Sequence, residues 1–368
     1  MTSLNQHIHN GEIFQKSRCI WHENAMMDFF RSQLQMLGYH SVSVSNKVWA
    51  RGSQQVVICL ADDIYTCRAQ GYRGPLATTW DSNTTVITDN YINCATQYPV
   101  YRLPDSYFGI YHYQPELNDW QPSRRFNFAV NRLDAKRLIL FLQLLHTTIK
   151  PDPDPMHHDW PWLLDLDRDF VNFNCWHWKS TNDSAQVFQE NFVSEFENLA
   201  PGLQKLYRNT FDQITAHMPY RNHDLSLEQS HVQAWLNLVV ETYSSDFTIA
   251  LSEKTFRALV TPVPFLLYAG RYTTAMLIRL GFDIMADLVQ HRTDFMGEKY
   301  TGQVGDRLVD FFIDAEKSVL ELKEQSFDAV KSRCLQAAQH NQNLLAQMAQ
   351  KWPADFAAWW PSVLAKIS

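Results

Sequence analysis

Three short stretches decide the fold of this chain: Ala234–Glu241 reads AWLNLVVE, Ser252–Leu259 reads SEKTFRAL and Phe265–Gly270 reads FLLYAG. The first and third contain apolar runs typical of buried strands, and we predict strands at 234–240 and 265–268. The middle stretch predicts a helix, and Thr273–Leu280 predicts a second helix that ends before Gly281. This β-α-β-α order is typical of a parallel, doubly wound sheet whose ligand lies at the carboxyl ends of the strands.

The first 150 residues show the same alternation of helices and strands, as spacing of apolar residues indicates. The expected elements are a helix at Glu23–Leu37, strands at Ser41–Ser45, Gln55–Ala61, Thr85–Thr88 and Phe126–Val130, and a helix at Asp134–His146. The run KPDPDP at 150–155 interrupts this pattern, because proline lacks a backbone donor and restricts its predecessor. After Gly302 the chain reads as mostly helical, from about Val304 to Ala349. We therefore predict an α/β protein with two Rossmann-like lobes and a helical C-terminal extension.

The composition is that of an ordinary globular protein. Of 368 residues, 45% are hydrophobic and 19% are charged, and this length suits two cores better than one. The net charge of −7 makes nucleic acid an unlikely partner, although a local basic cleft is still compatible with it. No apolar run reaches the roughly 20 residues that cross a bilayer. Aromatic residues make up 13% of the chain, which fits a large aromatic core or a surface that stacks on sugars or bases.

The six cysteines are scattered without CxxC spacing. The first fifteen residues are polar and lack the apolar core of a secretory leader. We therefore expect free thiols and a cytoplasmic protein. Oligomeric state is left open by the sequence.

The main candidate site is the start of the helix that opens with Ser252-Glu253-Lys254. Ser252 is a plausible N-cap, so free N–H groups, the positive end of the helix dipole and the Lys254 ammonium converge on one small volume that suits a phosphate. Glu241, at the end of the preceding strand, is placed to accept hydrogen bonds from hydroxyls such as a ribose diol. The alternative is an ordinary N-cap whose first turn contains helix-favouring residues.

Four segments of this region carry a family resemblance: Asn237–Thr242 (NLVVET), Ile249–Arg257 (IALSEKTFR), Pro264–Gly270 (PFLLYAG) and Leu277–Phe282 (LIRLGF). Together they resemble the carboxyl lobe of glycosyltransferase-like proteins of bacteria and phages and, more loosely, the nucleotide-binding segment of fucosyltransferases. The resemblance implies a two-lobed fold of the GT-B type. It divides the chain into an acceptor-side α/β lobe (1–150), an irregular and helical linker (151–225), a nucleotide-binding segment (226–300) and C-terminal helices (301–368).

The resemblance also implies roles for particular residues. Lys254 would contact the donor phosphates, Glu241 or Glu253 the ribose, and Gly270 would end the short strand of the pattern. Upstream, Arg132 and Arg137 follow a strand and a basic turn similar to those that open the donor side, and arginine suits bidentate contact with pyrophosphate. The aromatic side chains expected to stack on base or sugar are Tyr243, Phe256 and Trp160. The pair Glu241-Thr242 departs from the Glu-Asn of fucosyltransferases, which leaves the sugar and the stereochemistry open.

Catalysis with inversion requires a general base in the amino lobe. The candidates are Asp62, Asp63, His158 and Asp159, and an aspartate after a strand is equally typical of ordinary loops. We expect no metal and no cofactor. Asp165-Leu-Asp167 and the His157-His158-Asp159 cluster lack the spacing of established metal sites.

The leading hypothesis is a metal-independent glycosyltransferase that moves a sugar from a nucleotide-diphosphate donor to an unknown acceptor. Lys254, Arg132 and the helix N-terminus would stabilise the charge that develops on the departing diphosphate. One alternative is a catalytically inactive module that binds a nucleotide or a glycan. Another is a phage-type enzyme that glycosylates DNA bases, which requires a basic cleft.

Overall fold

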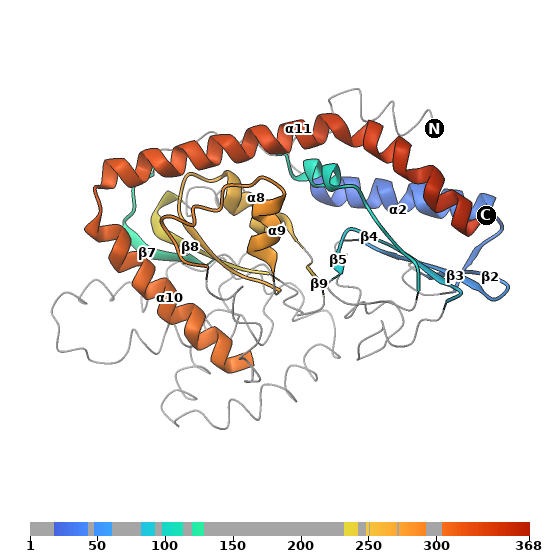
Figure 1. Ribbon diagram of the computed structural model, residues 1–368, viewed down its shortest axis with the longest axis horizontal. Coiled ribbons are helices and arrows are strands. Elements are labelled where there is room, and N and C mark those ends of the chain that lie inside the picture. Colours follow the sequence, from blue (N-terminus) through green and yellow to red (C-terminus); the bar gives the residue numbers. More distant parts are fainter. Residues whose placement is uncertain are drawn as a thin grey trace, which may run out of the picture.

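The computed structural model of the protein describes residues 18–42, 48–60, 82–92, 98–112, 120–128, 232–241, 248–249, 251–270, 272–291 and 304–368. These residues form a mixed α/β fold in which parallel strands pack against helices (Figure 1). The predicted helix at 134–146 and the whole linker at 151–225 lie outside the described residues, as do eight candidate residues: Asp62, Asp63, Arg132, Arg137, His158, Asp159, Trp160 and Tyr243. Their assigned roles stay predictions.

The N-terminal half of the described chain forms a five-stranded sheet. In sheet order its strands are β1 (His40–Ser41), β2 (Val48–Arg51), β3 (Gln54–Cys59), β4 (Thr84–Thr88) and β6 (Val100–Arg102). β3, β4 and β6 run parallel, whereas β1 and β2 pair antiparallel at one edge. All of β4 and the last four residues of β3 are buried, as expected for central parallel strands. The predicted strands 55–61 and 85–88 are confirmed, but β2 and β6 were not predicted.

A second sheet contains the segment that decides the fold. Its order is β10 (Phe265–Tyr268), β8 (Ala234–Val240) and β7 (Arg124–Phe128), and all three strands are parallel. Helices α8 (Glu253–Val260) and α9 (Thr273–Arg279) follow β8 and β10. The β-α-β-α prediction is therefore confirmed. The predicted strand at Phe126–Val130, which corresponds to β7, was expected in the first lobe. In the structure β7 pairs with β8 of the second sheet. Strand pairing depends on contacts between residues more than a hundred positions apart and not on chain order.

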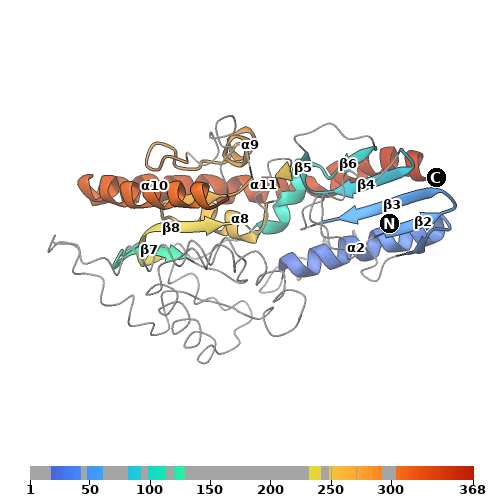
Figure 2. The same cartoon turned by 90° about the horizontal axis from the view of Figure 1, so that it is seen from below.

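A short third ladder joins the two regions. β5 (Tyr91–Ile92), just after β4, pairs antiparallel with β9 (Thr248–Ile249), just before α8. Figure 2 shows the arrowheads of β3 and β8 pointing toward the middle of the molecule from opposite sides. The carboxyl ends of the parallel strands in the two sheets therefore face the same central region.

The C-terminal helices connect both sheets. α10 (Val304–Glu324) lies against the C-terminal sheet, where Tyr268 and Phe311 pack edge to face. α11 (Phe327–Ile367) is 41 residues long, well beyond the predicted end at Ala349. It runs along the molecule from α8 past the 3-10 helix η4 (Asp105–Tyr111) to α2 (Arg18–Met36) (Figure 1). At its far end Trp360 packs on Phe29, with ring centroids 5.3 Å apart.

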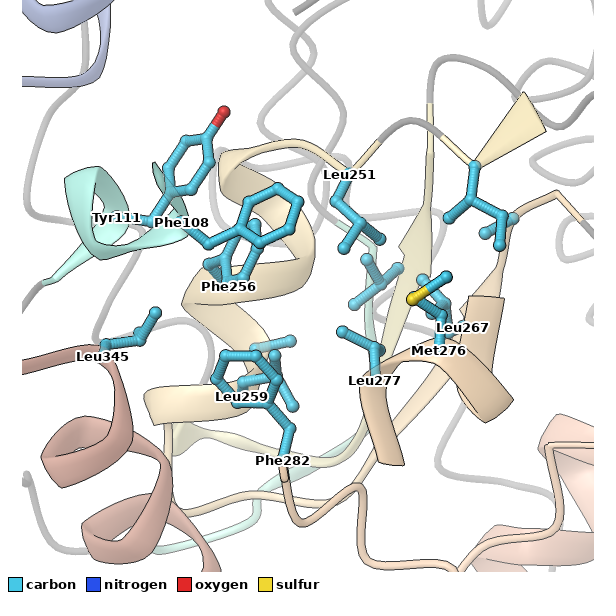
Figure 3. Close-up of a cluster of buried hydrophobic side chains, with 14 of the residues drawn as sticks. Phe108, Tyr111, Leu251, Phe256, Leu259, Leu267, Met276, Leu277, Phe282 and Leu345 are labelled. Carbon is cyan, nitrogen blue, oxygen red and sulfur yellow. The ribbon is translucent and has the colours of Figure 1, made fainter. Parts of the chain in front are cut away.

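Helix α11 and η4 touch through their backbones at Gly109. A Cβ added there would overlap the backbone N and Cα of Ala349 and would lie 2.6 Å from the carbonyl carbon of Met348. Only glycine permits this approach. The contact brings Phe108 and Tyr111 of η4 against Phe256 of α8, in the centre of one continuous hydrophobic core (Figure 3).

Two further observations concern the described residues. None of their helices is both long and apolar enough to cross a membrane. Cys59 and Cys334 are buried free thiols, and burial raises the pKa of Cys334 to about 12.

His291 is a buried histidine that makes stability depend on pH. Its Nε2 donates to the carbonyl oxygen of Ile284 at 3.0 Å, while Nδ1 is buried and has no hydrogen-bond partner within the described part of the chain. Burial lowers the pKa of this imidazole to about 4, against about 6.5 in the unfolded chain. The unfolded chain binds the extra proton first, so the stability is intact above pH 6.5 and is lost as pH falls toward 4.

We expect His291 to make unfolding about 2 to 3 kcal/mol easier at pH 4 than at pH 7. Urea unfolding at both pH values measures the difference in the free energy of unfolding between pH 7 and pH 4. In His291→Phe this difference should be about 2 to 3 kcal/mol smaller than in the wild type. His40→Gln, at an exposed histidine, is the control. An unchanged pH dependence in His291→Phe would contradict the assignment.

Candidate functional site

The start of α8 is anchored to the end of β8 by Glu241. The Glu241 carboxylate, which is 1% exposed, accepts hydrogen bonds from the Ser252 backbone N at 3.0 Å, from Ser252 Oγ at 2.6 Å and from Thr255 Oγ1. Ser252 Oγ in turn accepts from the Lys254 backbone N at 3.3 Å. The predicted N-cap at Ser252 is confirmed, and its extended backbone is typical of that position.

These contacts change the expected role of Glu241. The sequence placed its carboxylate toward a ribose diol, but both carboxylate oxygens accept hydrogen bonds from α8 itself. The reason is that the first donors of a helix have no partners within the helix, and those at the start of α8 lie within hydrogen-bond distance of this carboxylate. Glu241 is therefore a positioning residue that fixes where the first turn of α8 points.

Lys254 and Glu253 form an ion pair in this first turn. Lys254 Nζ lies 3.1 Å from Glu253 Oε1 and 3.5 Å from Ser252 Oγ, and the two side chains are 16% and 35% exposed. Burial by itself would raise the pKa of Glu253, but the charge and hydrogen bond of Lys254, with the charge of Arg257, lower it to about 2. The ammonium is thus held at the helix start, partly exposed, beside a carboxylate that stays ionised at neutral pH.

Phe256 belongs to the core and is not an exposed stacking platform. Its ring is stacked on Tyr111 at 4.4 Å between centroids, and Phe108 and Phe282 lie 5.2 Å and 5.8 Å away (Figure 3). Phe256 is 1% exposed. The expectation that it stacks on a base is therefore wrong, because the helix turns this side chain toward η4 and not toward the end of the sheet.

Gly270 lies at the same edge of the sheet as Glu241. The Glu241 N–H donates to the carbonyl oxygen of Tyr268, and the Gly270 carbonyl accepts from Thr273 Oγ1 at 2.6 Å. Tyr272, which follows, has a left-handed φ of 70° and is 45% exposed. A non-glycine residue in this conformation is uncommon outside turns and strained sites. Sequence reasoning missed this exposed aromatic side chain because no local pattern marks its conformation.

Helix α8 is held at its other end as well. Asn341 and Gln342 of α11 donate to the carbonyl oxygens of Leu259 and Val260, at 2.8 Å and 3.2 Å. These carbonyls belong to the last turn of α8, which has no partners for them within the helix. Both ends of the site helix are therefore fixed by side chains from other elements.

Within the described ranges, no group of three or more His, Cys, Asp or Glu side chains is arranged to hold a metal ion. Of the fourteen residues predicted for the site, six are described, and five of these gather at one edge of the C-terminal sheet: Glu241, Ser252, Glu253, Lys254 and Gly270. The sixth, Phe256, lies in the core.

Comparison of the chain with protein-family models, with curated proteins and with solved structures yields no match in any of the three.

Proposed function

We propose that this protein is a glycosyltransferase that moves a sugar from a nucleotide-diphosphate donor to an acceptor. The observation that carries the proposal is the start of α8: a capped helix N-terminus with a partly exposed lysine at the carboxyl edge of a parallel sheet. Helix N-termini at this edge are well suited to phosphate groups. The two parallel sheets that face a common central region support a two-lobed arrangement of the GT-B type.

In this proposal Lys254 and the α8 N-terminus stabilise the negative charge on the leaving diphosphate. Fixed charges and dipoles need no reorganisation during the reaction, so no metal is required. Glu241 acts indirectly, by holding the helix. The remaining roles stay with Arg132 and Arg137 on the diphosphate, Tyr243 on the base, and Asp62, Asp63 or Asp159 as general base.

The site predicts a strong effect of Lys254→Ala on donor use. Loss of one charged donor to a developing anion costs about 100-fold in turnover. A panel of nucleotide sugars, scored for thermal shift and for hydrolysis, identifies the donor, and the same assays are then run on the variant. We expect hydrolysis to fall about 100-fold and the thermal shift to decrease.

Lys317→Ala is the matched control, because Lys317 is a half-exposed lysine on α10. The proposal fails if no nucleotide sugar binds, or if Lys254→Ala binds and hydrolyses the donor as the wild type does. Binding without turnover in the wild type would indicate a binding module.

A further inference from the structure

Two arginines, one from strand β6 and one from helix α9, lie near one buried tyrosine ring. Tyr91 of β5 is 5% exposed and lies where β5 pairs with β9. The guanidinium carbon of Arg102, at the end of β6, lies 3.9 Å from the ring centroid. The guanidinium carbon of Arg279, at the end of α9, lies 5.5 Å from the same centroid. Arg102 and Arg279 are 177 positions apart in the chain, which explains why no local sequence pattern relates them.

The positive charge of this cluster exceeds its negative charge. Asp105 Oδ1 accepts hydrogen bonds from both Arg102 Nη2, at 2.5 Å, and the Tyr91 hydroxyl, at 2.6 Å. Arg279 donates to the Met276 sulfur at 3.0 Å and faces the Tyr91 ring, and no carboxylate of the described chain pairs with it. The cluster therefore contains two guanidinium groups and one carboxylate.

The charges of both arginines act on the Tyr91 hydroxyl. Burial raises the pKa of the Tyr91 hydroxyl, as does the hydrogen bond to Asp105, whereas the charges of Arg102 and Arg279 oppose this rise. Two like charges near one phenol repel each other, more strongly beside a buried ring than in water. A ligand with two negative charges would relieve this repulsion and accept hydrogen bonds from those Arg279 donors that have no partner among the described residues.

We propose that Arg102 and Arg279 form a binding site for a phosphoryl group. Guanidinium groups match phosphate oxygens in pairs of parallel hydrogen bonds, and Arg279 is exposed to solvent. Asp105, about half exposed, stays paired with Arg102 and Tyr91, and its single carboxylate leaves the cluster with a surplus of positive charge.

The site is connected to α8 by stacked aromatic rings. Tyr91 stacks on Phe108 at 6.1 Å, and Phe108 lies 5.2 Å from Phe256 in α8. Under the proposed function, on which this assignment of the ligand rests, two sources supply the phosphoryl group: the donor diphosphate or a phosphorylated acceptor. Their shared chemistry is a phosphate dianion.

Isothermal titration calorimetry of the full chain with inorganic phosphate, against sodium chloride of equal ionic strength, tests the site. We expect Arg279→Gln to weaken phosphate binding about tenfold, as expected for the loss of charge-assisted hydrogen bonds. Lys317→Gln, which removes a charge from α10, should bind phosphate as the wild type does. Arg102→Lys keeps the positive charge but loses the planar guanidinium group that makes paired hydrogen bonds, so it should also weaken phosphate binding.

Three outcomes would overturn the proposal: no phosphate binding by the wild type, wild-type affinity in Arg279→Gln, or an equal loss in Lys317→Gln. Lys254→Ala separates this site from the donor site, because it should lose nucleotide-sugar binding and keep phosphate binding. Titration of phosphate in the presence of a saturating nucleoside diphosphate distinguishes the sources: displacement assigns the site to the donor, and undiminished binding assigns it to a phosphorylated acceptor.

Discussion

Asn341→Leu is expected to lower the free energy of unfolding by about 4 kcal/mol. The Asn341 side chain is fully buried and makes three hydrogen bonds of 2.8 Å, to the carbonyl oxygens of Leu259 and Asp283 and from the backbone N–H of Asp283. Leucine has a similar size but neither donors nor acceptors. The substitution leaves three backbone groups without these partners, one buried at Leu259 and two partly buried at Asp283, and a buried group left this way costs about 1 to 3 kcal/mol.

The chain offers a close control two residues away. Asn343 lies on the exposed side of the same helix, so Asn343→Leu should change stability by no more than about 0.5 kcal/mol. Urea unfolding followed by circular dichroism measures both variants. A similar, small effect of the two substitutions would show that Asn341 does not hold α8, α11 and the segment around Asp283 together.

Glu241→Ala is expected to be nearly as destabilising, by about 3 to 4 kcal/mol, and to abolish donor binding. Three donors of the α8 N-terminus lose their acceptor: the backbone N and Oγ of Ser252, and Oγ1 of Thr255. The first turn of α8 then loses its fixed direction, and Lys254 moves with it. Urea unfolding and the nucleotide-sugar thermal shift report the two effects separately.

Glu253→Ala is the matched control for Glu241. It removes a carboxylate from the same turn, but this side chain is 35% exposed and its ion pair is worth no more than about 1 kcal/mol. If Glu241→Ala were no more destabilising than Glu253→Ala, the anchoring role of Glu241 would be incorrect.

Helix α11 contacts elements that belong to both halves of the described structure. Arg333 of α11 donates to both Asp283 and Asp287 with distances of 2.7 to 2.9 Å. Burial would raise the pKa of Asp283, but the hydrogen bonds from Arg333 and the Met285 backbone N–H, together with the arginine charge, lower it. Arg333 thus ties α11 to the segment around Asp283, while Asn341 ties it to α8 and Gly109 lets it pack on η4. Through these contacts the two sheets share one core.

The local sequence pattern was sufficient to predict the strands and the helix between residues 234 and 268. β8 and β10 have the predicted bounds, and α8 begins at the cap that Ser252 indicated. These features depend on neighbouring residues alone: apolar runs of strand length, a hydroxyl side chain before a helix, and a glycine after it. The same reasoning located the edge of the sheet where Glu241, Lys254 and Gly270 gather.

Other features depend on contacts between residues far apart in the chain, and only the folded chain decides them. β7 pairs with β8 although a long segment separates them in the chain. Phe256 packs in the core against Tyr111, and the Glu241 carboxylate accepts hydrogen bonds from the start of α8. The sequence shows that a strand ends in a carboxylate and that a helix begins with a lysine. It does not show which way these side chains point, because that direction is set by packing against η4 and α11, whose positions are encoded elsewhere in the chain.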